Sequence, residues 1–267
     1  MPTDRVRPKI LVTNDDGYQS FGLIEVARAL QALGDVTVVA PDADNSGVGH
    51  SISIKDPVRV SEVRDRAVPT YRCSGTPADC VVVGAYDVCG GMPSLVISGI
   101  NRGANLGDDL NYSGTVAAAI EGIIIGIPSI AVSLAASWPE PAVQHHWDTA
   151  AEVTLECARA LLEEPLPRLT LLNVNVPNVA AADVRGRRWT RQGRKPYRNR
   201  LDRRRDPRGQ TYYWLWGTFD PSEIEPGTDL EAVRDCYVSL TPVTIDRTDV
   251  ATLDARAGVR PWSQSSC

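Results

Sequence analysis

The feature that most constrains the fold is an alternation of buried strands and amphipathic helices that begins at residue 10. Residues 10–12 (Ile-Leu-Val) form a continuous apolar run, which is typical of a strand buried on both faces. Apolar residues then recur at three- and four-residue spacing over residues 23–33, which predicts a helix that Gly34 ends. A second apolar run follows at residues 36–40. Two parallel strands joined by a short crossover helix favour a doubly wound α/β fold.

The alternation continues to about residue 177 and then stops. Further strands are predicted at residues 95–98, 130–133 and 169–176, and helices at residues 115–125 and 147–162. Beyond residue 178, arginines, aromatic residues and turn residues replace the alternation of strands and helices. Strand-like runs occur there at residues 212–216 and 238–243. We therefore predict an α/β core at residues 1–177, built on a mostly parallel, Rossmann-like sheet. Residues 178–267 are predicted to form a smaller, irregular, arginine-rich and β-rich part.

Composition excludes several other classes of protein. Hydrophobic residues make up 43% of the 267 residues and charged residues 23%, as in globular proteins, which excludes disordered and fibrous chains. No apolar run approaches the ~20 residues of a membrane span, and the N-terminus lacks the pattern of a secretory signal. The six cysteines include no CxxC pair, which indicates reduced thiols rather than disulfides or zinc ligands. We therefore expect a cytoplasmic protein with no membrane partner.

Charge is distributed unevenly along the chain. Residues 185–208, here called the basic strip, contain twelve Lys or Arg residues and two acids, a net charge of +10. The remaining residues include 16 basic and 31 acidic side chains, a net charge of −15. An acidic body with one basic strip favours a negatively charged ligand near the strip over general nucleic-acid binding, so no stable nucleic-acid partner is expected.

Three polar loops follow three of the predicted strands. They are residues 14–17 (NDDG), 42–51 (DADNSGVGHS) and 98–109 (SGINRGANLGDD). Because ligands of open parallel sheets bind beyond the carboxyl ends of the strands, we expect these loops to converge. Adjacent carboxylates repel one another, and a bound cation allows both to stay ionised. The carboxylate, hydroxyl and amide oxygens of these loops are ligands that suit magnesium, manganese or calcium. Taken alone, Asp15-Asp16-Gly17 is equally well read as a helix-entry turn.

A fourth segment has the features of an anion site. Ser113-Gly114-Thr115 directly precedes the predicted helix at residues 116–125. Free backbone N–H groups and the positive end of the helix dipole bind phosphate at such positions, and the hydroxyls add donors. Ordinary N-capping by Ser113 or Thr115 is the simpler interpretation of this segment by itself. A metal site and a phosphate site at one crevice together indicate phosphoryl chemistry.

The same segments carry a family resemblance. The strings VTNDDG, APDADNSG, SGTPADCV, SGINRGANLGDDLNYSGTVAAAIEG and YVSLTP resemble the survival protein E (SurE) family of metal-dependent nucleotidases. The resemblance implies an α/β phosphatase that hydrolyses nucleoside 5′- and 3′-monophosphates to nucleoside and phosphate, and in some members polyphosphate. It also implies one divalent ion per subunit and a homodimer or homotetramer whose C-terminal parts are exchanged between subunits.

The resemblance assigns roles to individual residues. The implied metal ligands are Asp15, Asp16, Ser46 and Asn101, and the implied phosphate and substrate residues are Asn105, Ser113, Gly114, Thr115, Gly75 and Thr76. The sequence departs from the family pattern in the acids that precede Ser46 and in the density of arginines in the basic strip.

We interpret the pattern as metal-activated attack of water on a phosphate. Asp15 and Asp16 are the candidate proton acceptors, and Asn105 is expected to stabilise charge on the transferred group. His50 is an alternative acid for the leaving oxygen, although a lone loop histidine is more often solvated.

The sequence also bears on three other functional classes. A phosphatase with an aspartate nucleophile requires a DxDx[TV] loop, and residues 15–18 (DDGY) break that spacing. A dinucleotide oxidoreductase requires GxGxxG after the first strand, where this chain has none. A non-catalytic nucleotide- or RNA-binding module would use the basic strip. Metal-dependent release of phosphate distinguishes the enzyme from this module, because a binding module releases none.

Overall fold

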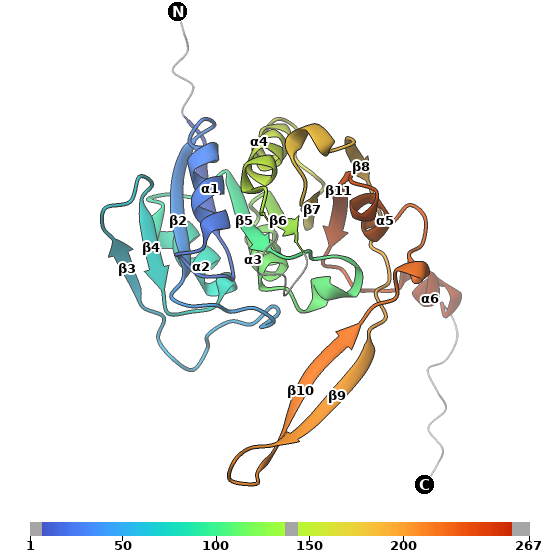
Figure 1. The fold of residues 1–267 in the computed structure, drawn as a ribbon. Helices are drawn as coiled ribbons and strands as arrows, with labels where there is room; N and C mark the ends of the chain where they lie inside the picture. Colours follow the sequence, from blue (N-terminus) through green and yellow to red (C-terminus); the bar gives the residue numbers. More distant parts are fainter. Residues whose placement is uncertain (1–6, 137–143, 258–267) are drawn as a thin grey trace, which may run out of the picture.

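The computed structural model describes residues 7–136 and 144–257 of the chain, and a mixed β-sheet forms its centre (Figure 1). Among the described residues this sheet has nine strands in the order β3-β4-β2-β1-β5-β6-β7-β11-β8. In chain order these are β1 (Lys9–Thr13), β2 (Asp35–Pro41), β3 (Val60–Val63), β4 (Thr70–Cys73), β5 (Leu95–Arg102), β6 (Ser129–Ala135), β7 (Thr170–Pro177), β8 (Arg187–Trp189) and β11 (Val238–Thr244).

The central strands, from β4 to β7 in the sheet order, are all parallel. β3 pairs antiparallel with β4, and β11 pairs antiparallel with β7. The predicted mostly parallel α/β fold is therefore confirmed. From β1 the chain moves outward through β2 to β4, and it then returns to the other side of β1 and continues through β5, β6 and β7. The direction of winding therefore reverses between β1 and β5, which is where open α/β sheets bind ligands.

Helices cover both faces of the sheet. α1 (Phe21–Leu30) and α4 (Trp147–Glu163) pack on one face, and α2 (Pro77–Val83) and α3 (Gly114–Ile124) pack on the other. Ile10 and Val12 of β1 point into the first layer and Leu11 points into the second. The continuous apolar run at residues 10–12 thus has the predicted cause, because β1 is buried on both sides.

The first helix ends earlier than its apolar spacing predicts. Ser20 caps α1 by accepting a hydrogen bond from the Leu23 N–H, and the helix stops at Leu30. Gly34 closes the following turn, since its N–H bonds to the Leu30 carbonyl at 3.2 Å. A Cβ at Gly34 would lie 2.2 Å from the Pro8 carbonyl oxygen, so only glycine allows the turn to pack against the start of β1.

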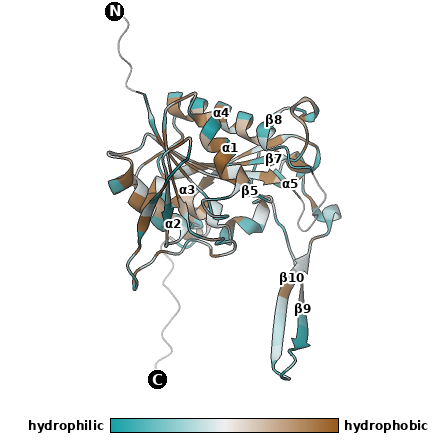
Figure 2. Cartoon of the chain, turned by 60° about the vertical axis from the view of Figure 1, so that its left-hand side comes forward, coloured by the Kyte–Doolittle hydropathy of each residue, from teal (hydrophilic) through white to brown (hydrophobic). Residues whose placement is uncertain are grey.

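The C-terminal part contributes both to the sheet and to a separate hairpin. The predicted strands at residues 212–216 and 238–243 are confirmed, but β11 belongs to the main sheet because it pairs with the outer edge of β7. β9 (Arg198–Arg205) and β10 (Thr211–Thr218) form a two-stranded antiparallel hairpin that projects from the body (Figures 1 and 2). The division of the chain at residue 177 stays a prediction.

The remaining elements are short. They are the π-helix η1 (Gly84–Val88), the 3-10 helices η2 (Gly107–Asn111), η3 (Ala181–Asp183) and η4 (Pro221–Glu223), and the α-helices α5 (Asp229–Arg234) and α6 (Val250–Ala255). No helix within the described ranges is long and apolar enough to cross a bilayer.

Candidate active site

The polar loops meet at the point where the winding of the sheet reverses. Asp15 and Asp16 follow β1, and Asn101 is the penultimate residue of the neighbouring β5. Together with the loops after β2 and β5 they line a cavity of about 480 Å³. Its lining comprises Asp15, Asp16, Asp44, Ser46, Gly47, Asn101, Arg102, Gly103, Ala104, Asn105, Asp109, Tyr112 and Ser113. All four of the predicted metal ligands therefore lie in one cavity.

Asp15 is the most deeply buried acid of this cavity, with 3% of its surface exposed. The Thr115 hydroxyl donates a hydrogen bond of 2.5 Å to Asp15 Oδ1. A Cβ at Gly114 would lie 2.7 Å from the Asp15 Cβ, so glycine is needed for α3 to begin against this carboxylate. Burial raises the pKa of Asp15, and the hydrogen bond from Thr115 acts in the opposite direction.

Asp16 lies beside Asp15 and accepts a backbone hydrogen bond of 3.3 Å from the Arg102 N–H. Burial, together with the negative charge of Asp15, raises the pKa of Asp16 to about 6. Asp44 adds to the repulsion felt by both carboxylates. The cavity therefore concentrates negative charge that a bound cation would relieve.

Ser46 and Asn101 supply neutral oxygens to the same cavity. Both the N–H and the hydroxyl of Ser46 donate to Asp44 Oδ1, at 2.8 and 2.6 Å, so the lone pairs of the hydroxyl remain available as acceptors. Asn101 Nδ2 donates to the Gly103 carbonyl at 2.9 Å, which leaves its Oδ1 as the atom able to accept. Within residues 7–136 and 144–257, no three His, Cys, Asp or Glu side chains are grouped to hold a metal. The candidate ligands instead combine two carboxylates with a hydroxyl and an amide.

Asn105 is held from three directions by buried side chains. Its N–H donates to Asn175 Oδ1 at 2.9 Å, and its carbonyl accepts from Asn173 Nδ2 at 3.0 Å and from Asn175 Nδ2 at 2.9 Å. Its own side-chain Nδ2 donates to Ser133 Oγ at 2.8 Å. The sequence reasoning did not identify Asn173, Asn175 or Ser133 as site residues.

The predicted phosphate segment begins α3. Ser113 lines the cavity and caps the helix, since its Oγ accepts from the Val116 N–H at 3.1 Å. Thr115 is fully buried and its hydroxyl is directed to Asp15 rather than to the open cavity. N-capping thus describes Ser113 correctly, and a phosphate role for Ser113, Gly114 and Thr115 stays a prediction.

Gly75 and Thr76 lie at the junction of β4 and α2, and neither belongs to the cavity lining given above. Thr76 forms a capping box with Asp79, and its hydroxyl donates to the Ser51 carbonyl at 2.7 Å. Asp79 also accepts two hydrogen bonds from Ser53. These contacts anchor the loop after β2, and the substrate role predicted for Gly75 and Thr76 stays untested.

Neither His50 nor the basic strip contributes a residue to the cavity lining. His50 pairs with Glu121 Oε2 at 2.9 Å and lines a different pocket. Much of the basic strip is neutralised within the chain by acids: Arg187 pairs with Glu156, Arg191 with Glu225, Arg194 with Asp108, Lys195 with Asp109, Arg198 with Asp220 and Glu223, and Arg204 with Asp202.

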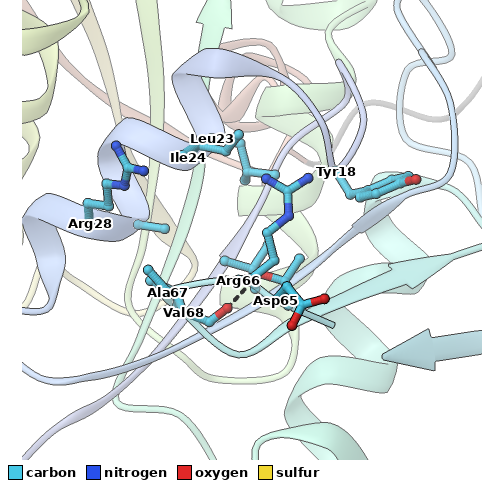
Figure 3. Close-up of a pocket in the computed structure, with 11 residues that line it drawn as sticks. Tyr18, Leu23, Ile24, Arg28, Asp65, Arg66, Ala67 and Val68 are labelled. Atoms are coloured by element: carbon cyan, nitrogen blue, oxygen red, sulfur yellow. Dashed lines mark hydrogen bonds between the residues drawn. The ribbon is translucent and has the colours of Figure 1, made fainter. Parts of the chain in front are cut away.

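A smaller pocket of about 140 Å³ lies between α1, β2 and the turn after β3 (Figure 3). Leu23, Val38 and Val68 give it an apolar lining, to which Arg28 and Arg66 also contribute. It contains none of the predicted site residues, and we do not consider it the active site.

Comparisons with known proteins agree with the geometry. The family model described as Survival protein SurE matches residues 10–199. The chain is 46% identical over 245 residues to the protein named 5′-nucleotidase SurE of Pelobacter propionicus, which covers 91% of this chain and 96% of that protein. It is 42% identical over 258 residues to the protein of the same name from Geobacter sulfurreducens, covering 97% and 95%. The crystal structure of the SurE protein from Aquifex aeolicus matches with a TM-score of 0.81 and 40% identity, covering 93% of this chain and 98% of that chain. The chain therefore belongs to the SurE family.

Proposed function

We propose that this chain is a metal-dependent 5′-nucleotidase that hydrolyses nucleoside 5′- and 3′-monophosphates to nucleoside and phosphate. The observation that carries the proposal is the convergence of Asp15, Asp16, Ser46 and Asn101 in one cavity next to the start of α3. The two curated relatives described above bear the name 5′-nucleotidase, which supports the same activity. Hydrolysis of polyphosphate is a further activity that this site chemistry permits.

The donor set fits a divalent cation such as magnesium or manganese. Asp15 and Asp16 lie side by side, and burial raises the pKa of both, as expected for carboxylates that lack a fully compensating positive charge. Oxygen donors of this kind suit hard cations, and the neutral Ser46 and Asn101 keep the total negative charge low enough for an anionic phosphate to approach. When bound, the ion would neutralise phosphoryl charge and make a water molecule more acidic.

The chain's own groups orient the phosphate and move the proton. Ser133 accepts one N–H of the Asn105 side-chain amide, which leaves the second N–H for a phosphoryl oxygen. The positive end of the α3 dipole favours a phosphate at this position, although the Val116 N–H already donates to Ser113 Oγ and the Thr115 N–H to Asp15. The water oxygen bonds to phosphorus as the ester P–O bond breaks, and Asp15 or Asp16 accepts the proton of the attacking water. The leaving alkoxide takes its proton from a molecule of bulk water.

Assembly into a homodimer or homotetramer with exchange of residues 178–267 is part of the proposal. The projecting β9–β10 hairpin exposes Tyr212 and Trp214, with 40% and 59% of their surfaces accessible, on the face opposite Leu201 and Leu215. A second copy of the chain would bury this apolar surface. A cytoplasmic location, inferred from the reduced cysteines, stays a prediction.

The test is phosphate release from AMP after removal of metal with EDTA, followed by addition of magnesium or manganese. We expect activity to disappear and to return with the metal, and Asp16→Asn to lose about 10²-fold or more in kcat/KM. Asp42→Asn is the matched control, because Asp42 follows β2 and is exposed outside the cavity. Binding of AMP without release of phosphate would support the binding module instead.

A further inference from the structure

The active-site cavity adjoins a larger groove. Gly47 and Tyr112 line both the 480 Å³ cavity and a groove of about 1020 Å³. This groove lies between η2 and the base of the β9–β10 hairpin, and we call it the hairpin groove. Its lining also includes Asp108, Arg194, Lys195, Tyr197, Leu201 and Leu215. The part of a substrate that lies beyond its phosphate can therefore extend from the cavity past Tyr112 into this groove.

The basic residues of the hairpin groove are neutralised locally. Arg194 Nε lies 3.2 Å from Asp108 Oδ1, and Lys195 Nζ lies 2.5 Å from Asp109 Oδ2. The Lys195 N–H also donates to Asp108 Oδ2 at 2.8 Å. These two cations and two anions sum to a net charge of zero. The groove consequently offers little electrostatic attraction to a chain of further phosphates, although it is built partly from the basic strip.

The remaining surface of the groove is aromatic and aliphatic. Tyr112 is 66% exposed, and Tyr197 presents its ring while its hydroxyl donates to Asp109 Oδ1 at 2.7 Å. Leu201 and Leu215 from the two hairpin strands complete the apolar part. Exposed aromatic rings beside a phosphate site provide a surface on which a nucleobase can stack.

We propose that the hairpin groove receives the nucleoside of the substrate, with its base stacked on Tyr112. This inference rests on the proposed nucleotidase function and names the part of the substrate that the groove selects. The groove thus favours a neutral nucleoside as the leaving group over a polyanion such as polyphosphate. Stacking needs no particular pattern of donors and acceptors on the base edge, so purine and pyrimidine nucleotides both fit.

The test compares kcat/KM for AMP with kcat/KM for ribose 5-phosphate, which carries the same phosphate on a sugar without a base. We expect the wild-type ratio to exceed about ten, and Tyr112→Ala to lower it by about fivefold or more, the loss expected for one stacked base. Tyr112→Phe keeps the ring and should keep the ratio. Tyr86→Ala is the control, because Tyr86 is an exposed tyrosine on η1 that does not line either site.

A second measurement does not depend on catalysis. Titration calorimetry with adenosine in EDTA should show binding to the wild type and weaker binding to Tyr112→Ala, while thermal unfolding shows whether the variant is folded. A ratio near one, a ratio unchanged by Tyr112→Ala in a folded protein, or tripolyphosphate hydrolysed more efficiently than AMP would overturn the inference. Failure of the wild type to release phosphate from either AMP or ribose 5-phosphate would instead overturn the proposed function.

Discussion

Asn175→Ala is the substitution that best tests how the site is positioned. Asn175 is fully buried on β7, and its side chain binds both the N–H and the carbonyl of Asn105. Residue 105 lies between β5 and η2, outside any helix or strand, so these side chains replace the backbone partners that a regular element would supply. The alanine variant removes this support without touching the cavity lining itself.

The expected loss of stability follows from the partners left behind. The buried N–H of Asn105 would lose its acceptor, at a cost of about 1–3 kcal/mol. The carbonyl keeps the hydrogen bond from Asn173, so the loss there is only that of one ordinary hydrogen bond, about 1 kcal/mol. We therefore expect the free energy of unfolding to fall by about 2–4 kcal/mol.

The assay is urea unfolding combined with kcat for AMP at saturating metal. If Asn105 moves, kcat should fall by about tenfold or more, whereas a purely structural role would leave kcat of the folded fraction unchanged. Asn178→Ala is the matched control, because the Asn178 side chain also makes two hydrogen bonds to the backbone, accepting from the His146 N–H and donating to the Gln144 carbonyl. Asn178 lies outside the cavity lining. Equal effects of the two variants on kcat would refute the positioning role.

Three further outcomes are expected. In EDTA, the pKa of Asp16 is about 6 in the folded protein, compared with about 3.8 when unfolded, so the folded state retains a proton that the unfolded chain releases. The contribution of Asp16 to the free energy of unfolding should therefore fall by up to about 3 kcal/mol as pH rises from about 4 to 6. Urea unfolding of Asp16→Asn should lack this component. Thr115→Val removes the hydrogen-bond donor that favours ionised Asp15, so the acidic limb of the pH profile of kcat/KM should move to higher pH. Thr115→Ser keeps the donor and should keep the wild-type profile. An unmoved acidic limb in the valine variant would contradict this role. Replacing Tyr212 and Trp214 with serine should reduce the oligomer measured by light scattering, and an unchanged mass would exclude this face of the hairpin from the interface.

Five of the parallel strands could be predicted because each contains an apolar run bounded by turn residues: β1, β2, β5, β6 and β7. β3 and β4 could not, since each has only four residues and β3 is a partly exposed edge strand. β9 was also missed, because the arginine-rich sequence of residues 198–205 has no hydrophobic alternation to indicate a strand. β10 was recognisable from its aromatic and β-branched residues.

The shared location of Asp15, Ser46 and Asn101 could be predicted because the carboxyl ends of parallel strands lie at one edge of a sheet. The direction of a hydroxyl could not be predicted: the Thr115 hydroxyl contacts Asp15 in the structure, and its phosphate role stays a prediction. Asn173 and Asn175 did leave a signal in the sequence. Two polar residues at alternate positions of an otherwise buried strand face the same side and require partners.

The two ends of the proposed substrate are held by different kinds of structure. Asp15 and Asn105 are almost fully buried, and their positions are set by strands packed between two helical layers. The hairpin groove instead depends on exposed side chains of η2 and of the hairpin, such as Tyr112 and Leu215, which few neighbours constrain. A substitution in the core therefore changes stability and phosphoryl transfer together, because the same hydrogen bonds serve both. A substitution on the hairpin alters the surface presented to the leaving group while the phosphate end stays in place, so substrate preference can change independently of the chemistry.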